Sequence, residues 1–523
     1  MAFKSRIVPW GMFIVCAIVF LLGTRVISQH IDIFISPDET ANRFFIQAFS
    51  QTGSYRVHDA LNGQINGLSH PRSVITDGSY FLPVGFLGLS TLYAFFSFFF
   101  GLWILLFLTP LIALLAVCAW MKLLEQWFPK PVAMISGFIL LFHPAFWYYA
   151  SRGLMPNVLF VSMLIFAACF LYVQPIKKIF VSRQNIDIFL AGFFMSFALF
   201  VRFSEVYWIL PCVLAWFIFK RLQIKPILFF LFGCFIPMSF FLFLNAQTYG
   251  DPFTTGYQFI SSFQQNTSSL SQDDAVANNL QWLFPFGIHL PEMIKHTFYY
   301  FVGLFSWMTV LAGIGVFFVW RSKQPSHRHY LLVSFLIALW LIVWYGSWIL
   351  HDNPDPKQIT IANSYVRYWL PLFILSTPFI ASACYKISAF GRTRFSKRFI
   401  LGAILLVVFG LNTQIVFFRG EDALLSVSQT LKDSKQIRAR VFDLTPSDAV
   451  LIVDRADKLF FPYRHVMYPL RSETTYAAMP RILDYAPLFY YGVTFPKQDL
   501  DYLNQKKFVD LGLTITFIQS FGV

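Results

Sequence analysis

The chain has 523 residues, of which 57% are hydrophobic and 13% charged, and its mean hydropathy is +0.60. Soluble proteins carry about 25% charged residues, so this composition excludes an ordinary soluble protein and indicates an integral membrane protein. The net charge of +14 does not indicate a nucleic-acid partner, because the basic residues gather in loops expected on one side of a membrane. All six cysteines lie in apolar segments, so we expect neither a disulfide framework nor a zinc site.

The apolar segments predict a polytopic helical protein. A helix needs about 20 apolar residues to cross a bilayer. The first segment follows Lys4 and Arg6 as a signal peptide would, but it has no clear small-residue cleavage site, so we interpret it as a retained helix. The sequence predicts about eleven spans, near 9–29, 101–121, 132–150, 156–174, 187–203, 206–219, 226–245, 298–319, 331–350, 366–385 and 399–418.

The loop charges predict the orientation of these spans. With the N-terminus inside, the inner segments hold 18 of the 27 Lys and Arg residues before position 419. This agrees with the positive-inside rule and places the acidic pair Asp38 and Glu39 outside. The short polar loops and the expected lack of disulfides favour a prokaryotic plasma (inner) membrane.

The first outer loop, about 30–100, opens on Ser36-Pro37-Asp38-Glu39. Ser36 suits a helix N-cap, Pro37 suits the first helical position, and Glu39 stands where a capping box needs its carboxylate. We therefore expect a helix that begins at the membrane surface with Asp38 in its first turn. Further along the loop, the sequence predicts turns at Asn62-Gly63 and Asn66-Gly67 and an interfacial helix over Tyr80–Phe100.

Three further outer segments carry arginines that suit a phosphate. These are His70-Pro71-Arg72, Ser151-Arg152 in a tight turn, and Arg367-Tyr368 before Pro371. A guanidinium offers paired donors to phosphate oxygens, and an arginine at membrane depth is costly without an anionic partner. Contact with lipid headgroups, snorkelling and an interfacial aromatic belt are the competing interpretations. The other candidates are His289 and Tyr345 as pocket residues, and an Arg202–Glu205 pair that we interpret as structural.

The composition changes after Phe418. Residues 419–523 hold 13 Lys and Arg against 12 Asp and Glu, which is typical of a soluble domain. The pattern predicts a helix over 421–441 and strands over 449–453 and 513–518. We therefore expect a transmembrane catalytic domain over 1–418 and a small α/β domain over 419–523 on the outer face.

These features together resemble the GT-C class of polytopic glycosyltransferases, which use polyprenyl-phosphate sugars. The resemblance rests on Asp38-Glu39 in a long first outer loop, Ser151-Arg152, Arg367-Tyr368 with Pro371, and the outer C-terminal domain. It covers about residues 1–420. One departure is at position 41, where Ala stands at the place of an arginine in the lipid A aminoarabinose transferases; the nearest arginine is Arg43.

The resemblance implies an inverting transfer in which Asp38, with Glu39 beside it, takes the proton of the acceptor. It implies donor-phosphate binding by Arg72, Arg152 and Arg367. The expected donor or acceptor pocket contains His70, His289, Tyr345 and Tyr368. Some members hold a divalent metal near the acidic pair and others hold none, so Asp38 and Glu39 are also the candidate metal ligands.

Other functions fit parts of the pattern. A glycan ligase acting on a lipid diphosphate would share the outward arginines without needing Asp38-Glu39. A transporter or flippase would place ionisable residues in mid-span and carry inverted repeats, whereas the charges here lie at span ends. A receptor or scaffold would depend on the C-terminal domain. The sequence leaves open the sugar, the lipid length and an acceptor that is protein, lipid or glycan.

Overall fold

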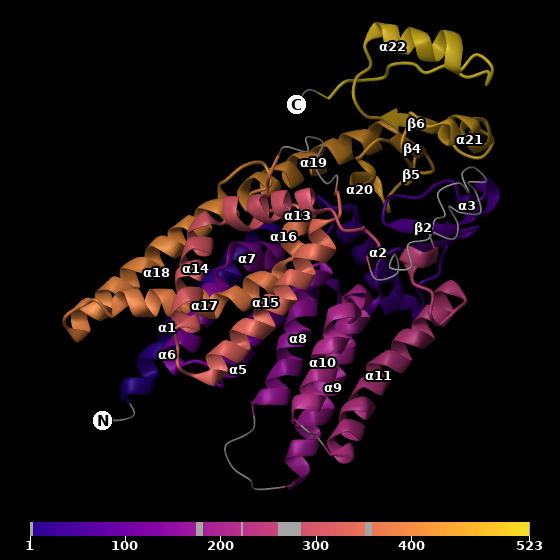
Figure 1. The fold of residues 1–523 in the computed structure, drawn as a ribbon. Helices are drawn as coiled ribbons and strands as arrows, with labels where there is room; N and C mark the ends of the chain where they lie inside the picture. The colour runs from indigo at the N-terminus through magenta and orange to yellow at the C-terminus, as the bar shows by residue number, and fades with distance from the viewer. Residues whose placement is uncertain (1–3, 174–180, 221–222, 260–283, 351–357, 522–523) are drawn as a thin grey trace. The chain divides into compact units, whose positions relative to one another are not determined.

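The computed structural model describes residues 4–173, 181–220, 223–259, 284–350 and 358–521. They form a mostly helical protein with two small sheets (Figure 1). Contacts within the chain divide it into two compact units. Unit 1 comprises Met1–Gln29, Leu105–Phe241 and Leu270–Val427, and unit 2 comprises His30–Ile104, Leu242–Ser269 and Ser428–Val523.

Unit 1 consists mainly of apolar helices. The last residues of α11 belong to unit 2 and the first residues of α19 belong to unit 1. In chain order the helices are α1 (Lys4–Ser28), α5 (Leu105–Leu124), α6 (Lys130–Leu141), α7 (Pro144–Ser151), α8 (Pro156–Tyr172), α9 (Val181–Val201), η2 (Phe203–Glu205), α10 (Val206–Lys220), α11 (Ile224–Tyr249), α13 (Leu290–Thr297), η3 (Phe298–Gly303), α14 (Ser306–Trp320), α15 (Pro325–Gly346), α16 (Ser364–Tyr368), α17 (Leu370–Ser388) and α18 (Arg394–Phe417).

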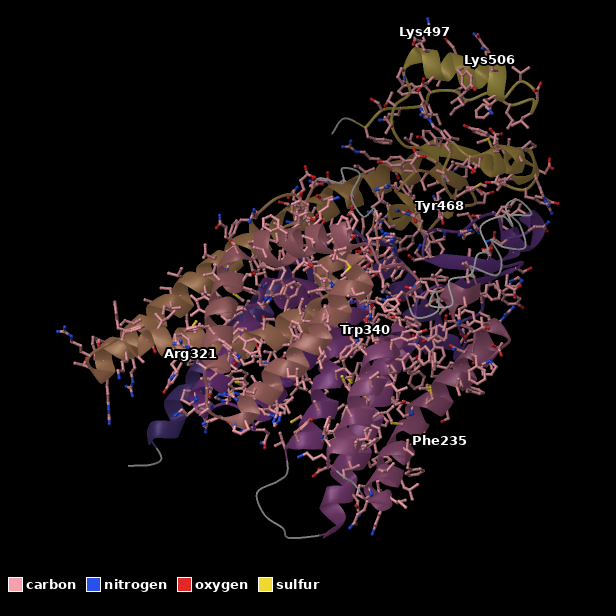
Figure 2. The ribbon with its side chains drawn as sticks, viewed as in Figure 1. Phe235, Arg321, Trp340, Tyr468, Lys497 and Lys506 are labelled. Atoms are coloured by element: carbon pink, nitrogen blue, oxygen red, sulfur yellow. The ribbon has the colours of Figure 1, made fainter. Side chains whose placement is uncertain are left out.

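The chain is a multi-pass integral membrane protein. In the described part, seven helices are long and apolar enough to cross a membrane, and up to nine spans result if each of two bent helix pairs counts as one. Side chains such as Phe235 on α11 are largely exposed, as lipid-facing residues are (Figure 2). The predicted count of eleven is not confirmed, because α8 and the stretch Asn185–Val201 of α9 are apolar but shorter.

The two bent pairs correct the simple picture of straight spans. The predicted span 132–150 bends by 49° between α6 and α7, and the predicted span 298–319 falls in a pair that bends by 97° before Ser306. At the first bend, Asn412 of α18 donates through Nδ2 to the carbonyl oxygen of Phe142 at 2.9 Å. A break inside an apolar bundle frees backbone groups that must find partners, and Asn412 supplies one.

Helix α17 is the most enclosed of the seven described helices that are long enough to cross a membrane. In its most apolar stretch of 18 residues, 78% of the residues are buried. The helix packs against α6, α14 and α18. Its approach to α14 is close, since a Cβ at Gly315 would overlap the carbonyl oxygen of Phe379. Small residues permit such close backbone contact between membrane helices. This packing holds the segment that carries Arg367 and Tyr368, which directly precedes α17.

Unit 2 combines the first loop with the C-terminal residues. Sheet β1-β3-β2 is antiparallel, with Val74 opposite Pro83 and Asp77 opposite Tyr80. Sheet β5-β4-β6 is parallel, with Val450 opposite both His465 and Leu488. The elements are α2 (Pro37–Thr52), β1 (Val57–His58), α3 (Ala60–Ile65), β2 (Val74–Asp77), β3 (Tyr80–Pro83), α4 (Gly88–Phe100), η1 (Leu102–Ile104), α19 (Leu424–Leu444), β4 (Val450–Val453), α20 (Asp457–Phe460), β5 (His465–Met467), α21 (Glu473–Leu483), β6 (Leu488–Tyr491), α22 (Lys497–Tyr502) and η4 (Leu503–Lys507).

The core of the C-terminal sheet includes a residue of the first loop. Ile65 at the end of α3 is fully buried together with Val450, Ile452 and Ile482. The contacts therefore join 428–523 to the first loop in one unit. The division at residue 418 into a membrane-embedded part and a soluble part outside the membrane stays a prediction.

Several local predictions are corrected. Asn62-Gly63 lies inside α3, where Asp59 is the N-cap, whereas Asn66 is a left-handed C-cap with φ 58° as a turn there requires. The predicted interfacial helix over Tyr80–Phe100 begins only at Gly88. Its first residues form β3 instead, because they pair with β2.

The predicted strand over 513–518 is wrong, although its alternation is real. Leu513 and Ile515 pack against the core while Thr514 and Thr516 are exposed. However, Ile515 bonds a side chain rather than a strand: its N–H donates to Asn504 Oδ1 at 2.8 Å, and its carbonyl accepts from Asn504 Nδ2 at 3.1 Å. The amide of Asn504 thus satisfies the backbone that a neighbouring strand would satisfy.

Candidate functional site

Asp38 lies in the first turn of α2, as the sequence predicts. Ser36 is the N-cap with extended backbone (φ −114°, ψ 138°), and Pro37 is the first helical residue. The Ser36 hydroxyl accepts from the N–H of Asp38 at 3.2 Å, rather than from Glu39 as a capping box would have it. This bond satisfies one of the backbone N–H groups that the first turn of a helix leaves without a partner.

The two members of the acidic pair differ in exposure. Glu39 is buried, with 3% of its surface exposed, whereas Asp38 is partly exposed. Asp38 is therefore the carboxylate that can meet a substrate. Within the described ranges no group of three His, Cys, Asp or Glu side chains could hold a metal ion, so the fit of Asp38 and Glu39 to a metal is incomplete and no step is assigned to one.

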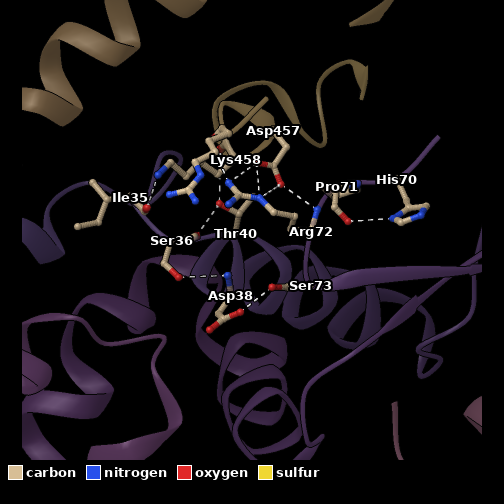
Figure 3. A network of polar contacts seen from close by, with 11 residues as sticks. Ile35, Ser36, Asp38, Thr40, His70, Pro71, Arg72, Ser73, Asp457 and Lys458 are labelled. Atoms are coloured by element: carbon tan, nitrogen blue, oxygen red, sulfur yellow. Dashed lines mark hydrogen bonds and ion pairs between the residues drawn. The ribbon is translucent and has the colours of Figure 1, made fainter. Parts of the chain in front are cut away.

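A serine of the same loop contacts the Asp38 carboxylate (Figure 3). The Ser73 hydroxyl donates to Oδ1 of Asp38 at 2.5 Å. The sequence analysis did not identify Ser73, since nothing in its neighbourhood marks it as a partner of a residue 35 positions earlier.

Arg72 forms an ion pair instead of presenting an open guanidinium. Its Nη2 donates to Oδ1 of Asp457 at 2.6 Å and to the carbonyl oxygen of Arg455 at 2.9 Å (Figure 3). Its Nε donates to Oδ1 of Asp457 at 3.0 Å, and its backbone N–H donates to Oδ2 at 2.8 Å. Asp457 is completely buried, and such a carboxylate needs a cation beside it. The predicted role of Arg72 at a donor phosphate therefore competes with this pair.

The C-terminal residues also contact the start of α2. Lys458 donates through Nζ to the carbonyl oxygen of Ile35 at 2.5 Å, and Thr40 donates through its hydroxyl to the carbonyl oxygen of Lys458 at 3.5 Å. The N-terminal turn that carries Asp38 is thus supported by residues more than 400 positions away in the chain, since 418 and 423 residues separate these pairs.

His70 belongs to the same loop as Arg72 and contacts its surroundings through both its imidazole nitrogen and its ring. Its Nδ1 donates to the carbonyl oxygen of Pro71 at 3.1 Å, and its ring meets Tyr468 edge to face at 5.8 Å (Figure 2 labels Tyr468). Burial lowers the pKa of His70 below its ordinary value of 6.5, because a charged imidazolium is poorly solvated there. His70 is therefore a neutral structural support of the turn at neutral pH.

The lowered pKa of His70 predicts a pH effect on stability. The unfolded chain binds this proton more readily than the folded chain. The contribution of neutral His70 to the unfolding free energy is therefore fully present above pH 6.5 and decreases as the pH falls below that value. The His70→Asn variant, whose amide can still donate to Pro71, should reduce the slope of unfolding free energy against pH by up to about 1.4 kcal/mol per pH unit. Equal slopes in wild type and variant would contradict this, and His58→Asn at an exposed position is the matched control.

Two arginines of unit 1 lie against one tyrosine ring. The guanidinium carbon of Arg202 is 4.8 Å from the ring centroid of Tyr368, and that of Arg367 is 5.1 Å from it. The Tyr368 ring also belongs to a near-parallel aromatic stack. Its centroid is 4.7 Å from that of Tyr345 and 5.7 Å from that of Trp348, and the Trp348 centroid is 4.3 Å from that of Phe286. The structure thus brings together the predicted residues Tyr345, Tyr368 and Arg367.

The Arg202–Glu205 pair predicted from the sequence is present and buried. Arg202 donates to Oε1 of Glu205 through Nε at 3.1 Å, and its Nη2 lies 3.0 Å from the same oxygen. Glu205 also accepts from the Tyr345 hydroxyl at 2.6 Å and from Trp208 Nε1 at 2.6 Å. Arg202 is 8% and Glu205 2% exposed, so this is a satisfied polar network inside an apolar unit.

Arg152 lies at the end of α7 and is 4% exposed, with its guanidinium 5.9 Å from the Tyr148 ring. The turn after it contacts the segment of Arg367: Arg367 donates through Nη1 to the sulfur of Met155 at 3.4 Å, and Asn157 donates to the carbonyl oxygen of Arg367 at 3.2 Å. The structure thus links the turns that bear two of the three predicted phosphate ligands, Arg152 and Arg367.

His289 precedes α13, and its side chain is exposed. Its backbone N–H donates to the Ser347 hydroxyl at 3.2 Å, next to Trp348 in the aromatic stack. This contact places the backbone of His289 near that stack and gives its imidazole no assigned role.

Comparison with known proteins shows the fold. No family model matches the chain, and no curated protein matches it. The solved structure of ArnT from Cupriavidus metallidurans bound to undecaprenyl phosphate is similar, with a TM-score of 0.54 and 13% identity over 96% of this chain and 95% of that one. The apo state of the same ArnT gives a TM-score of 0.52 and 12% identity over 98% and 95%.

A second kind of solved structure is also similar. The Archaeoglobus fulgidus oligosaccharyltransferase, tethered with an acceptor peptide containing the NVT sequon, gives a TM-score of 0.51 and 11% identity over 90% of this chain and 65% of that chain. At these identities the likeness concerns the fold, and the GT-C-like fold implied by the resemblance is confirmed.

Proposed function

We propose that this protein is an inverting glycosyltransferase that moves a sugar from a polyprenyl-phosphate donor to an acceptor at the extracytoplasmic face of the membrane. The observation that carries the proposal is the Asp38 carboxylate, fixed in the first turn of α2 by Ser36 and Ser73. A polyprenyl-phosphate donor is supported by the shared fold with an ArnT structure that has undecaprenyl phosphate bound. The N-terminus is then inside and Asp38 outside, in a membrane that we propose to be prokaryotic.

Asp38 is the general base of the proposed reaction. The acceptor hydroxyl or amide attacks the anomeric carbon, its proton passes to the Asp38 carboxylate, and the bond from that carbon to the phosphate oxygen breaks. The bonding electrons remain on polyprenyl phosphate, which leaves. A phosphate is already a good leaving group, so a single base suffices, and such base catalysis contributes about 10²–10⁴-fold.

Arg152 and Arg367 are the proposed ligands of the donor phosphate. Charge accumulates on the phosphate as the bond breaks, and fixed cations stabilise that charge. The turn after Arg152 contacts the segment of Arg367 through Met155 and Asn157, so neighbouring segments carry the two guanidinium groups. Arg72 is a weaker candidate for this role because Asp457 already compensates its charge.

The test is donor binding and turnover by the purified protein. We expect saturable binding of undecaprenyl phosphate linked to glucose, mannose or an aminopentose, with a preference among the sugars. Addition of an acceptor extract should release free undecaprenyl phosphate. Binding only to a lipid-diphosphate glycan would favour the glycan ligase, and movement of the lipid across vesicles without sugar transfer would favour the flippase.

Replacing Arg152 by Ala should weaken donor binding by roughly 10- to 100-fold, because a hydrogen bond to a charged group is lost. Acceptor binding should change less. The measurement is titration with the preferred donor and, in parallel, with undecaprenol, which lacks the phosphate and should bind both variants equally. Arg321→Ala is the matched control, since Arg321 also lies over an aromatic ring in unit 1 but is exposed. An unchanged donor affinity in Arg152→Ala would remove this residue from the phosphate site.

A further inference from the structure

The turn that precedes β2 has a conformation its sequence does not favour. Residues 71–74 form a turn in which the N–H of Val74 donates to the carbonyl oxygen of Pro71 at 3.4 Å. Ser73, the third residue, has φ of 62°. A positive φ at this position is the requirement of a type II turn, which Gly or Asn meets without strain. A serine held there indicates that its side chain is needed.

Asp457 holds this turn in place through the residue before Ser73. Its carboxylate accepts from both the backbone N–H and the guanidinium of Arg72, at 2.6 to 3.2 Å. The backbone bond matters most, because it fixes the Pro71–Arg72 peptide, one residue before Ser73. Since Asp457 is completely buried, the Arg72 main chain has little freedom to move away from it.

The last contact in this series joins the Ser73 hydroxyl to the carboxylate of Asp38, the proposed base. The Ser73 hydroxyl donates to Oδ1 of Asp38 at 2.5 Å, while the Ser36 hydroxyl accepts from the Asp38 backbone N–H at 3.2 Å. The backbone of Asp38 is thus held from α2 and its carboxylate from the turn. Both holds come from the same unit, and all of these residues are drawn in Figure 3.

We propose that Ser73 is a positioning residue that sets the orientation of the Asp38 carboxylate for proton abstraction, and that Asp457 acts through Arg72 to keep Ser73 in place. The proposal rests on the proposed function, in which Asp38 is the base. A general base must lie within hydrogen-bond reach of the proton that it takes, and a misplacement of about 1 Å can cost about 10²-fold in rate. The strained serine is the means by which the loop meets that demand.

The test compares two variants of Ser73. Ser73→Gly removes the hydroxyl and relieves the backbone, so the protein should unfold at the same or a higher temperature. Its kcat for release of undecaprenyl phosphate from the preferred donor should nevertheless fall at least about tenfold, with KM for that donor within about twofold. Ser73→Asn tolerates the left-handed backbone and carries an amide donor, so its kcat should exceed that of Ser73→Gly.

The outcomes separate this proposal from the proposed function. Full turnover by Asp38→Asn would refute the base itself and with it the proposed function. If Asp38→Asn is inactive while Ser73→Gly keeps kcat within twofold of wild type, only the positioning role fails. A Ser73→Gly variant whose kcat and thermal midpoint fall together, or a Ser73→Asn variant no faster than Ser73→Gly, would also overturn the role, because the serine would then be serving the fold.

Discussion

Asp38→Asn is expected to lower kcat by about 10²–10⁴-fold and to leave the protein folded. The amide keeps the shape of the side chain, and its oxygen can still accept from Ser73. What it loses is the ability to take a proton from the acceptor. Loss of one negative charge in the first turn of α2 should cost only about 0.3–1 kcal/mol of unfolding free energy, so thermal unfolding in detergent should stay close to that of wild type.

The control for this variant removes the same charge elsewhere in unit 2. Asp484 is exposed at the C-terminal end of α21, and Asp484→Asn should retain wild-type turnover. Donor binding should be retained in both variants. Near-normal turnover by Asp38→Asn would refute the base assignment, and loss of donor binding would show that Asp38 acts in binding rather than in chemistry.

Glu205→Gln is expected to destabilise the protein by about 3–5 kcal/mol, the cost of removing one partner of a buried ion pair. The glutamine keeps the shape but leaves the Arg202 guanidinium, 8% exposed, without its carboxylate. The hydroxyl of Tyr345 and the indole of Trp208 also lose a charged acceptor. The measurement is the unfolding free energy, or the shift of the thermal midpoint, in one detergent for all variants.

An exposed ion pair of the same spacing provides the comparison. Lys122 and Glu125 are also three residues apart, at 3.3 Å, but 55% and 28% of their side chains are exposed. Surface pairs contribute about 0–1 kcal/mol, so Glu125→Gln should be nearly neutral. If the two substitutions lower the unfolding free energy by the same amount, burial does not explain the contribution of the Arg202–Glu205 pair to stability.

Local rules predicted the parts of the site that neighbours in sequence decide. Ser36 and Pro37 define the start of α2 through an N-cap and a fixed φ, and both act within one helical turn. Arg202 and Glu205 could be paired from their spacing of three. The apolar segments predicted a polytopic helical membrane protein, the resemblance implied a GT-C-like fold, and both are confirmed.

Long-range partners could not be predicted in this way. Nothing near Arg72 indicates that Asp457, 385 residues later, neutralises it, and an isolated Arg in an outer loop therefore suggested a free phosphate ligand. The 513–518 segment failed for a related reason. Alternation reports which side chains face the core, and it does not report whether the backbone finds a strand or, as here, the amide of Asn504.

These long separations along the sequence also affect how a truncated chain would be interpreted. A scaffold would depend on the C-terminal domain, but deleting 419–523 does not separate a scaffold from an enzyme, because it removes Asp457, Lys458 and the core residues packed around Ile65. Loss of activity in that variant would follow for either kind of protein. Point variants of Asp38 and Ser73 distinguish the two.

The pairing of Arg72 with Asp457 also has a consequence for biosynthesis. At a ribosomal rate of about 5–20 residues per second, the 385 residues between them take roughly 20 to 80 s to synthesise. Throughout that time the nascent chain contains Arg72 and Ser73 but lacks Asp457, the carboxylate that holds the turn. The turn at Ser73 can therefore take its final conformation only after the residues around Asp457 have been synthesised and have folded against the first loop.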